Sequence, residues 1–389
     1  MKKLNRISDT FNSLDFIGHD TLLDDSPDQA EQLVVRTGQE KEPHFNDSAE
    51  IVIGSIIAAV AHFGSETERS LQYVRDIISN PEKMQIAIKM MCESDDYDGL
   101  LSRIGNKLKN YEGKERASVM TTVERHLRFL DVPAIADSTK RSSFDPGDLL
   151  KGKMTVYLVL PPDRFRACAG LLRMWLGAML RAVVKGGAQE SKKVHFICDE
   201  AATLGRMEAI NDAIDKYRGY GVRLQLYYQS LGQLKTCFPE DQGQTALSNT
   251  TQVFFGVNDH QTAEYVSNRL GERTIIIHSG GSGDGSSTQH SEDGKGSHSY
   301  SHNTNYNWSQ HAQKLLKPEQ VTSLDPRVAV TFTPGCPPIW SRLIRYYVWD
   351  FKLNSGMGLW RSALDTACLF LTALMLAALW TGILLQQMR

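Results

Sequence analysis

Short β-type runs alternate with helical patterns through the second half of the chain. The candidate strands are Met154–Leu160, Val194–Cys198, Val222–Tyr228, Gln252–Val257 and Val328–Thr333. A helical pattern separates the first two, and another, Met207–Tyr217, separates the next two. Parallel strands require crossover connections of this kind, usually helices. The alternation therefore predicts an α/β fold with a mostly parallel sheet over residues 133–350.

Two acidic residues lie at the tip of one predicted strand. Val194–Cys198 is followed directly by Asp199 and Glu200. Sheets of α/β proteins bind ligands at the C-terminal ends of their strands. At such a place Asp199 can hold a hydrated Mg²⁺ while Glu200 polarises the water that attacks a γ-phosphate. Acidic residues also favour helix N-termini, so a purely structural role fits the same two residues.

A glutamine follows the next predicted strand. Gln229 comes directly after Val222–Tyr228 and would lie beside the acidic pair if the two strands are neighbours. Its amide could then contact the γ-phosphate and respond to its loss. The alternative is that Ser230 and Gln233 cap the next helix and that Gln229 is only part of the loop before it.

Two arginines are candidates for a contribution in trans. Ring-shaped motors complete each nucleotide site with a guanidinium group from the neighbouring subunit, which matches the planar phosphate geometry. Arg206 and Arg223 are the candidates in this sequence. Either could instead pair with an acidic residue of its own subunit, namely Asp199, Glu200 or Glu208.

Residues 46–132 show helical periodicity. Apolar residues recur at steps of three and four in Ile51–Phe63, Thr67–Ile78, Pro81–Cys92, Tyr97–Leu108 and Ala117–Phe129. The pattern predicts an inserted all-α domain, preceded by a connector or partial core element at residues 1–45. Basic residues could form a nucleic-acid surface on it, although solvated helix faces explain them equally well; they are Lys107, Lys109, Lys114, Arg116, Arg125 and Arg128.

One further helix and one low-complexity tract complete the core region. In Phe165–Lys185 the pattern places Leu172 and neighbouring apolar residues on one face, with Arg166, Arg173 and Arg181 on another. Residues 279–309 are rich in Gly, Ser, His and Asn and cannot bury much apolar surface, which predicts a flexible loop. The Gly294–Lys295 pair inside this tract has no strand before it and no helix after it, so it is not a phosphate loop.

The residues around the acidic pair resemble one family. Asp199-Glu200 followed by Leu204-Gly205-Arg206, then Arg218–Arg223, then Gln229–Leu234, is similar to the type IV secretion coupling proteins, the TraG/TraD-like conjugative DNA-transfer ATPases. Weaker resemblance extends over residues 11–349. It implies a RecA-like P-loop NTPase core that uses ATP and Mg²⁺, with Gln229 in the γ-phosphate-sensing role. It also implies partners: a DNA–relaxosome nucleoprotein, secretion-channel components, and further copies in a hexameric ring.

One part expected of that family is missing from this sequence. A phosphate-cradling loop should precede the segment with which the chain begins, and none precedes Phe11. The chain is therefore expected to be the C-terminal portion of a coupling protein, which binds ATP and Mg²⁺ only if the Walker A loop is supplied from elsewhere. Two alternatives stay open: a non-catalytic remnant or docking subunit, and a double-stranded DNA pump of the FtsK/HerA type.

Charge and hydropathy set the remaining expectations. The net charge of −2 restricts any contact with nucleic acid to a local patch or a pore lining. In the tail, residues 351–389, the uncharged run Thr366–Leu385 has the length of a transmembrane helix, about 30 Å at 1.5 Å per residue. More basic residues precede than follow it, which would keep the core on the cytoplasmic face of the bacterial inner membrane. A hydrophobic helix buried in an oligomer is the alternative.

Overall fold

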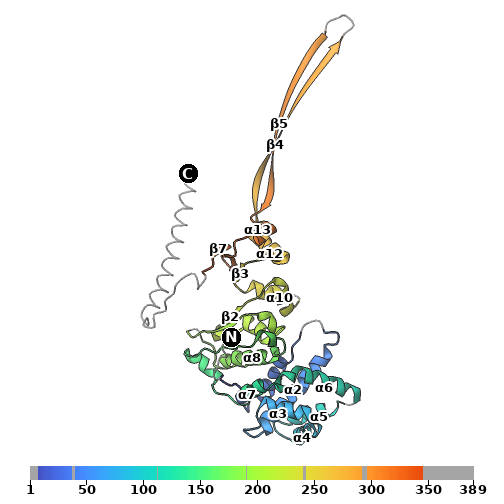
Figure 1. The fold of residues 1–389 in the computed structure, drawn as a ribbon, viewed down its shortest axis with the longest axis vertical. Helices are drawn as coiled ribbons and strands as arrows, with labels where there is room; N and C mark the ends of the chain where they lie inside the picture. Colours follow the sequence, from blue (N-terminus) through green and yellow to red (C-terminus); the bar gives the residue numbers. More distant parts are fainter. Residues whose placement is uncertain are drawn as a thin grey trace, which may run out of the picture.

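The computed structural model describes residues 8–36, 40–111, 113–189, 191–239, 242–290 and 296–344. The molecule is elongated (Figure 1): a bundle of helices lies at one end, the α/β core lies in the middle, and a two-stranded ribbon projects from the opposite end. The candidate site belongs to the middle part, so the two ends matter here for how they connect to it.

The predicted helices of the N-terminal half are present. They are α2 (His44–Phe63), α3 (Leu71–Ser79), α4 (Pro81–Cys92), α5 (Leu100–Lys109) and α6 (Gly113–Leu127), followed by the short α7 (Pro133–Thr139). The side chains of Ser70 and Asn80 accept backbone N–H groups at the starts of α3 and α4, which is why those helices begin there. α2 is the central helix, and its Ile53, Ile56 and Ile57 are fully buried.

The core of this helical region extends beyond it. The N-terminal segment forms a 3₁₀ turn at Ser13–Phe16 and the helix α1 (Leu22–Leu33), which packs against both α2 and α8 (Ala169–Lys185). One continuous hydrophobic cluster includes Leu14 and Leu33 from this segment and Leu171 from α8. The segment expected to be a connector or partial core element therefore forms a layer between the helices and the α/β core.

The α/β core is centred on two parallel strands. β1 (Val194–Cys198) pairs with β2 (Val222–Leu226) in a register that runs from Val194↔Val222 to Cys198↔Leu226. α9 (Glu208–Asp215) connects them, and α8 supplies buried side chains such as Leu180 and Val183 to the same cluster. This β–α–β arrangement confirms the predicted parallel pairing for these two strands.

The other predicted strands differ from the expectation. β3 (Gln252–Phe255) and β6 (Val328–Phe332) belong to a separate antiparallel sheet. Its third strand, β7 (Ile339–Arg342), was not predicted, and the order is β3-β6-β7. Met154–Leu160 does not form a strand in the described structure. Its Val156 and Leu158 pack against the core while Tyr157 and Val159 are exposed. The strand was predicted from alternating apolar and polar residues. In the described structure these residues do not pair with another strand.

The remaining helices link the two sheets to the ribbon. They are α10 (Leu231–Cys237), α11 (Gln242–Ser248), α12 (His260–Leu270) and α13 (Pro318–Thr322). The tract predicted to be a flexible loop is instead part of an antiparallel hairpin of β4 (Glu272–His290) and β5 (Gly296–Lys314). The prediction was wrong because it considered only apolar burial; the ribbon is ordered by backbone pairing along its length.

The structure does not test the predicted membrane anchor. Among the described residues, no helix is both long enough and apolar enough to cross a bilayer. The run Thr366–Leu385 lies outside those residues.

Candidate functional site

The acidic pair and the glutamine meet at one edge of the β1–β2 sheet. Because the two strands are parallel and in register, their C-terminal ends lie side by side. The backbone pairing continues past both strands, since Tyr227 N–H donates to the Cys198 carbonyl (3.1 Å) and Ala201 N–H to the Tyr227 carbonyl (3.0 Å). This holds Gln229 beside Glu200, and its Nε2 donates to Glu200 Oε1 at 3.0 Å and to Oε2 at 3.3 Å.

The backbone at Glu200 has an unusual conformation. Its φ of 58° and ψ of 45° lie in the left-handed region, which non-glycine residues seldom adopt. The chain turns there and enters the 3₁₀ segment Ala201–Leu204. Such conformations cluster at functional sites, where the surrounding structure enforces them. The side chain of Glu200 is half-buried and that of Asp199 is exposed, so both carboxylates lie at the open edge of the sheet.

The hydrogen bonds at the start of α10 also involve Gln229. Ser230 Oγ accepts the N–H of Gln233 (3.4 Å), and Gln233 Oε1 accepts the N–H of Gln229 (2.8 Å). Ser230 is the N-cap of α10, and the Gln233 side chain contacts the residue before it rather than the N-cap itself. The cap orients Gln229, because Gln233 Nε2 also donates to Gln229 Oε1 (3.4 Å). A helix start therefore positions the amide that contacts Glu200.

The residues beneath the site are uncharged. Burial raises the pKa of the Cys198 thiol to about 11. Burial also raises the pKa of the Tyr228 hydroxyl above its usual range, with smaller contributions from Cys237 and Cys198. These groups stay protonated at neutral pH, so they provide an apolar floor and no base or nucleophile. The charged groups of the sheet edge are Asp199 and Glu200.

The two candidate arginines contact other groups. Arg206 pairs with Glu208, with Nη2 and Nε at 2.9 and 3.0 Å from Oε1. Arg223 lies opposite His195 in the register and donates to the carbonyls of Arg218 (3.0 Å) and Val222 (2.7 Å). Three residues separate Arg223 from the end of β2, roughly 10 Å along the strand. Neither arginine is brought to Glu200 within this chain, so a role in trans stays a prediction.

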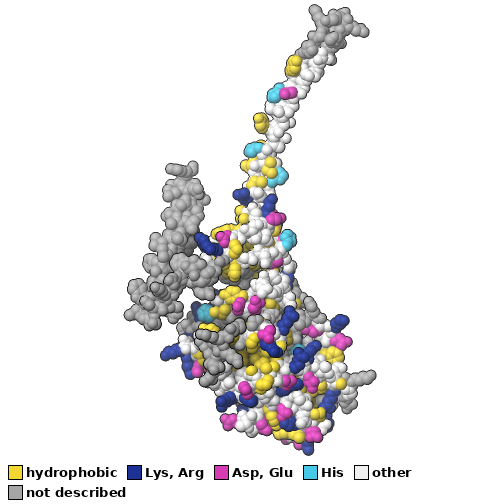
Figure 2. Space-filling view, in the orientation of Figure 1, with side chains coloured by type: hydrophobic (Ala, Val, Ile, Leu, Met, Phe, Trp, Pro, Cys, Tyr) yellow, Lys and Arg dark blue, Asp and Glu magenta, His cyan; other side chains and the backbone are white. Residues whose placement is uncertain are grey.

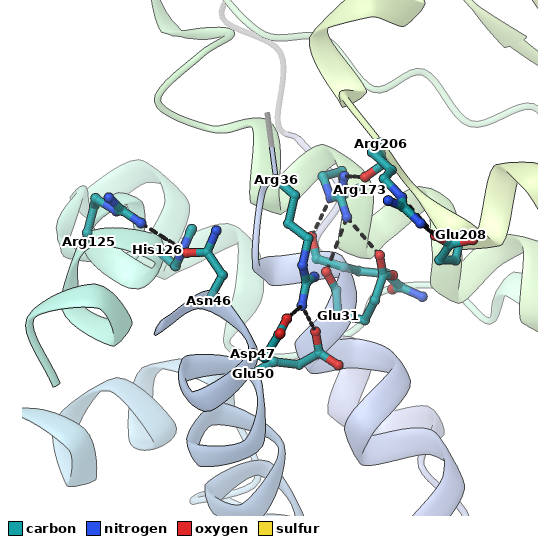
Figure 3. A network of polar contacts seen from close by, with 11 residues as sticks. Glu31, Arg36, Asn46, Asp47, Glu50, Arg125, His126, Arg173, Arg206 and Glu208 are labelled. Atoms are coloured by element: carbon teal, nitrogen blue, oxygen red, sulfur yellow. Dashed lines mark hydrogen bonds and ion pairs between the residues drawn. The ribbon is translucent and has the colours of Figure 1, made fainter. Parts of the chain in front are cut away.

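The sequence pattern placed Arg173 on a polar face of its helix, but in the structure this residue connects several segments behind the site and is the hub of that region. Arg173 of α8 is fully buried (0% exposed). Its Nε donates to the Gln32 carbonyl (2.7 Å) and its Nη1 to the Leu204 carbonyl (2.7 Å) and to the Arg206 carbonyl. Its Nη2 contacts Glu31 Oε1 at 3.0 Å (Figure 3). Arg173 thus ties the turn that follows Glu200 to the end of α1.

The sequence does hold a signal for this burial. Gly170 and Gly177 flank Arg173 on the same face of α8, at spacings of three and four residues. A Cβ at Gly170 would lie 3.0 Å from the Leu33 carbonyl oxygen, so α1 approaches α8 closely along that face. An arginine between two such glycines faces the neighbouring helix. Burial lowers the pKa of Arg173 and raises that of Glu31, and each is partly compensated by its partner.

A second arginine connects the same turn to the helical region. Arg36 forms an antiparallel β-bridge with Arg206. Its Nη2 lies 2.9 Å from Asp47 Oδ1 and 2.5 Å from Glu50 Oε2, both in the first part of α2. Figure 3 shows the cluster between the helical region and the turn. The backbone bridge and the guanidinium group of Arg36 therefore connect the helical region to the turn that follows Glu200.

The start of α2 also contacts α6. Asn46 Oδ1 accepts a hydrogen bond from Arg125 Nη2 (3.1 Å) and lies 3.0 Å from His126 Nε2. Arg125, a candidate for a basic surface, is exposed and donates a hydrogen bond within the helical region, to Asn46.

Sequence comparison gives one matching family and several relatives. The family model described as Type IV secretory system Conjugative DNA transfer matches residues 2–358. The conjugal transfer protein TraG of Rhizobium radiobacter is 27% identical over 342 residues, which cover 85% of this chain and 51% of that protein. Protein VirD4 of the same organism is 28% identical over 323 residues, which cover 82% and 44%. The chain spans about half the length of the curated relatives it matches.

Comparison of structures shows the fold. The bacterial conjugative coupling protein TrwBΔN70 in its unbound form has a TM-score of 0.64 and 15% identity, covering 87% of this chain and 71% of that chain. TrwB in complex with ADP and Mg²⁺ gives a TM-score of 0.62 at the same identity. The chain thus has a TrwB-like fold, in which β1 and β2 form a small parallel sheet.

Proposed function

The chain belongs to the type IV secretory system conjugative DNA transfer family, and from this membership we propose that it is a coupling-protein subunit that uses ATP to move a DNA–protein substrate towards a secretion channel. The observation that carries the proposal is the contact of Gln229 Nε2 with Glu200 at 3.0 Å, at the shared tip of two parallel strands. A docking subunit has no need for an amide oriented onto a carboxylate whose residue has a left-handed backbone at the open edge of the sheet.

The roles of the site residues follow from their placement. Glu200 accepts hydrogen bonds through both oxygens, so it can hold and polarise a water molecule when Gln229 turns towards a phosphate. Asp199 is exposed beside it and can hold a hydrated metal ion through water. Oxygen ligands of this kind fit Mg²⁺, which when bound supplies charge neutralisation for phosphate oxygens. TrwB has been solved with ADP and Mg²⁺ and with an ATP analogue, which supports this assignment.

The proposal has two further parts, which are the source of the phosphate-binding group and the assembly of the subunits. No Gly-Lys-Ser/Thr sequence occurs among the 389 residues, so the group that grips the phosphates is proposed to come from another polypeptide segment. The subunits are proposed to form a homo-oligomeric ring, with Arg206 or Arg223 reaching the neighbour's nucleotide. The ring is proposed to lie at the cytoplasmic face of the inner membrane and to bind DNA–relaxosome complexes.

ATP hydrolysis tests the proposal. We expect no hydrolysis by the purified chain alone, and hydrolysis when it is co-purified with the part of a TraG relative that lies outside the match. Glu200→Gln should then lower the rate about 10²- to 10⁴-fold, because the general base is lost. Gln229→Ala should lower it as well.

The matched control is Glu208→Gln, which removes a nearby carboxylate that pairs with Arg206 instead. The proposal fails if Glu200→Gln and Glu208→Gln have equal rates. Robust hydrolysis by the chain alone would show that the phosphates are held by residues other than those proposed.

A further inference from the structure

Every hydrogen-bond donor of the Arg173 side chain has an acceptor. A guanidinium group carries five N–H bonds in a fixed planar arrangement. Nε donates to the Gln32 carbonyl, and the two N–H bonds of Nη1 are directed at the carbonyls of Leu204 and Arg206. Nη2 lies 3.1 Å from the Glu31 carbonyl oxygen and 3.0 Å from its Oε1. Most of these acceptors belong to the main chain, so Arg173 holds segments of backbone as well as a carboxylate.

The burial of this arginine is exceptional in the molecule. Figure 2 shows Lys and Arg side chains spread over the surface of the helical and α/β parts. Arg173 is fully buried (0% exposed), and among the residues that the structure describes it is the only lysine or arginine that is buried. Burying a charge costs free energy that the packing of one helix on another does not require. The segments that Arg173 holds therefore indicate what it does.

One of these segments leads directly back to Glu200. The Thr203 N–H donates to the Glu200 carbonyl (2.9 Å), within the 3₁₀ segment Ala201–Leu204. The last residue of that segment provides one of the carbonyls that Arg173 binds. A single hydrogen-bonded turn thus separates the buried guanidinium group from the backbone of Glu200.

The other end of the turn is fixed by the sheet. Ala201 N–H donates to the Tyr227 carbonyl (3.0 Å), two residues before Gln229. A left-handed backbone at a residue other than glycine persists only where the surrounding structure enforces it. For Glu200 that structure is the sheet on one side of the turn and Arg173 on the other. If either is lost, the turn can relax and the carboxylate can move away from Gln229, which now lies 3.0 Å from it.

We propose that Arg173 is a positioning residue for ATP hydrolysis. By holding the carbonyls at the far end of the turn, it keeps the Glu200 carboxylate in place beside Gln229. The inference rests on the proposed function, since it takes Glu200 as the group that polarises the attacking water. It gives Arg173 no contact with the nucleotide. Misplacement of a reacting group by about 1 Å can lower a rate about 10²-fold, so a residue that acts only on position can have a large effect.

Arg181 offers a matched control on the same helix. Its Nη1 lies 3.1 Å from Asp25 Oδ1 and its Nη2 lies 2.7 Å from Asp28 Oδ2, so it also connects α8 to α1. The hydrogen bonds and ion pairs that it makes with described residues all lie on α1. Arg181→Lys therefore weakens the contact between the two helices only, whereas Arg173→Lys also affects the turn.

Amide hydrogen exchange on the full chain tests whether Arg173 holds the turn. In Arg173→Lys the peptide that covers residues 200–206 should exchange about tenfold faster than in the wild type, because an ammonium group cannot reach all the acceptors. The peptide that covers β2 should stay within about threefold, and Arg181→Lys should leave both peptides unchanged. Unchanged exchange of residues 200–206 overturns the inference. Equally faster exchange of both peptides shows only a loss of global stability and also overturns it.

A double-mutant cycle tests whether Arg173 acts on hydrolysis through Glu200. In the assembly with the TraG segment, Arg173→Lys should lower kcat about 10- to 100-fold, with KM for ATP unchanged within about twofold. Arg181→Lys should leave both constants unchanged. In the Glu200→Gln background, Arg173→Lys should change kcat by less than about threefold, since the group that it positions is already lost.

Two results of the cycle overturn the inference. A role in stability alone leaves kcat of the folded Arg173→Lys protein at the wild-type value. A role that does not involve Glu200 lowers kcat by the same factor in both backgrounds. Failure of the proposed function is seen separately, because Glu200→Gln itself then has no effect on the rate.

Discussion

At the scale of single residues, the site depends on a guanidinium group that never reaches solvent. Arg173 satisfies main-chain carbonyls on two segments, at Gln32 on one side and at Leu204 on the other, and it pairs with Glu31. The planar fork of arginine suits this task, and the ammonium group of lysine cannot reach all of these partners. Removing such a group leaves several polar atoms buried without a partner.

Arg173→Met should lower the free energy of unfolding by about 3–5 kcal/mol, the usual cost of breaking a buried charged network. The free energy of unfolding of Arg173→Lys should lie between that of Arg173→Met and that of the wild type. Urea denaturation measures both. The control is Lys216→Gln, which removes an exposed pair with Asp212 and should change nothing measurable. A loss below about 1 kcal/mol for Arg173→Met would contradict the role assigned to the hub.

A second residue makes the stability of the helical region depend on pH. Burial, and then the positive charge of Arg125, lowers the pKa of His126 from 6.5 to about 4. The unfolded chain therefore binds more protons than the folded one between these values, and the folded state loses stability as the pH falls through this window. The total contribution is roughly 3 kcal/mol.

The variant His126→Gln, which has no titrating ring, isolates this effect. Between about pH 7 and about pH 4.5, the wild type should lose more stability in urea denaturation than the variant, because the variant lacks the shifted group. Other titrating groups are common to both proteins and cancel in the difference. Equal losses would mean that His126 titrates in the folded protein at its ordinary pKa, which an NMR titration of the ring would show directly.

At the scale of elements, the turn between β1 and α9 concentrates unusual backbone geometry. Glu200 is left-handed, and five residues later Gly205 has φ 61° and ψ −156°, a region open essentially to glycine alone. A Cβ at Gly205 would also lie 3.1 Å from the carbonyl oxygen of Arg36, across the β-bridge of Arg36 with Arg206. The Leu204-Gly205-Arg206 motif is therefore explained by the approach of the N-terminal segment to this turn.

Gly205→Ala should destabilise the protein by about 1–3 kcal/mol, because alanine cannot adopt this conformation without strain. The control is Gly219→Ala, where nothing lies within 4 Å of an added Cβ and φ is not positive. That change should be neutral or slightly stabilising. Thermal and urea unfolding measure both variants, and similar losses in the two would show that strain at Gly205 is not the cause.

The elements also show how far the sequence could be interpreted. β1, β2 and the helices from α2 to α6 follow periodicity, and the parallel register brought Gln229 to Glu200 as expected. Residues 1–45 were interpreted as a connector or partial core element because Asp24, Asp25 and Pro27 are typical of connectors, and the sequence did not indicate that α1 packs on two helices. The hairpin was missed because strand pairing of polar residues leaves no hydrophobic signal. The burial of Arg173 depends on the close approach of α1 to α8, which hydrophobic periodicity does not indicate.

At the scale of the whole molecule, the helical region and the α/β core are not independent bodies. One hydrophobic cluster contains residues of α1, α2 and α8, and the ion cluster of Arg36 lies beside it. The hairpin is attached at the other end, through α12 and α13. The proposed site thus lies between a broad contact with the helical region and a narrow connection to the ribbon.

Membrane attachment is a prediction at this scale, and it concerns residues outside those described. A chain that ends at Phe351 should lose membrane association in cell fractionation if Thr366–Leu385 is the anchor. Leu376→Lys should weaken insertion of the full chain, since a charge at the centre of a span costs about 2.5–3.5 kcal/mol. Unchanged association of the truncated chain would place the membrane contact elsewhere in the protein.

The bridge between Arg36 and Arg206 couples α2 to the turn that follows Glu200. The helix is held near its first turn, through Asp47 and Glu50, by the segment that lies against the turn after Glu200. From Glu50 to the end of α2 at Phe63 the helix runs on for about 20 Å through the middle of the bundle. Because α1, α2 and α8 share one hydrophobic cluster, a shift of the turn after Glu200 would displace the helices as a group instead of being absorbed at the joint.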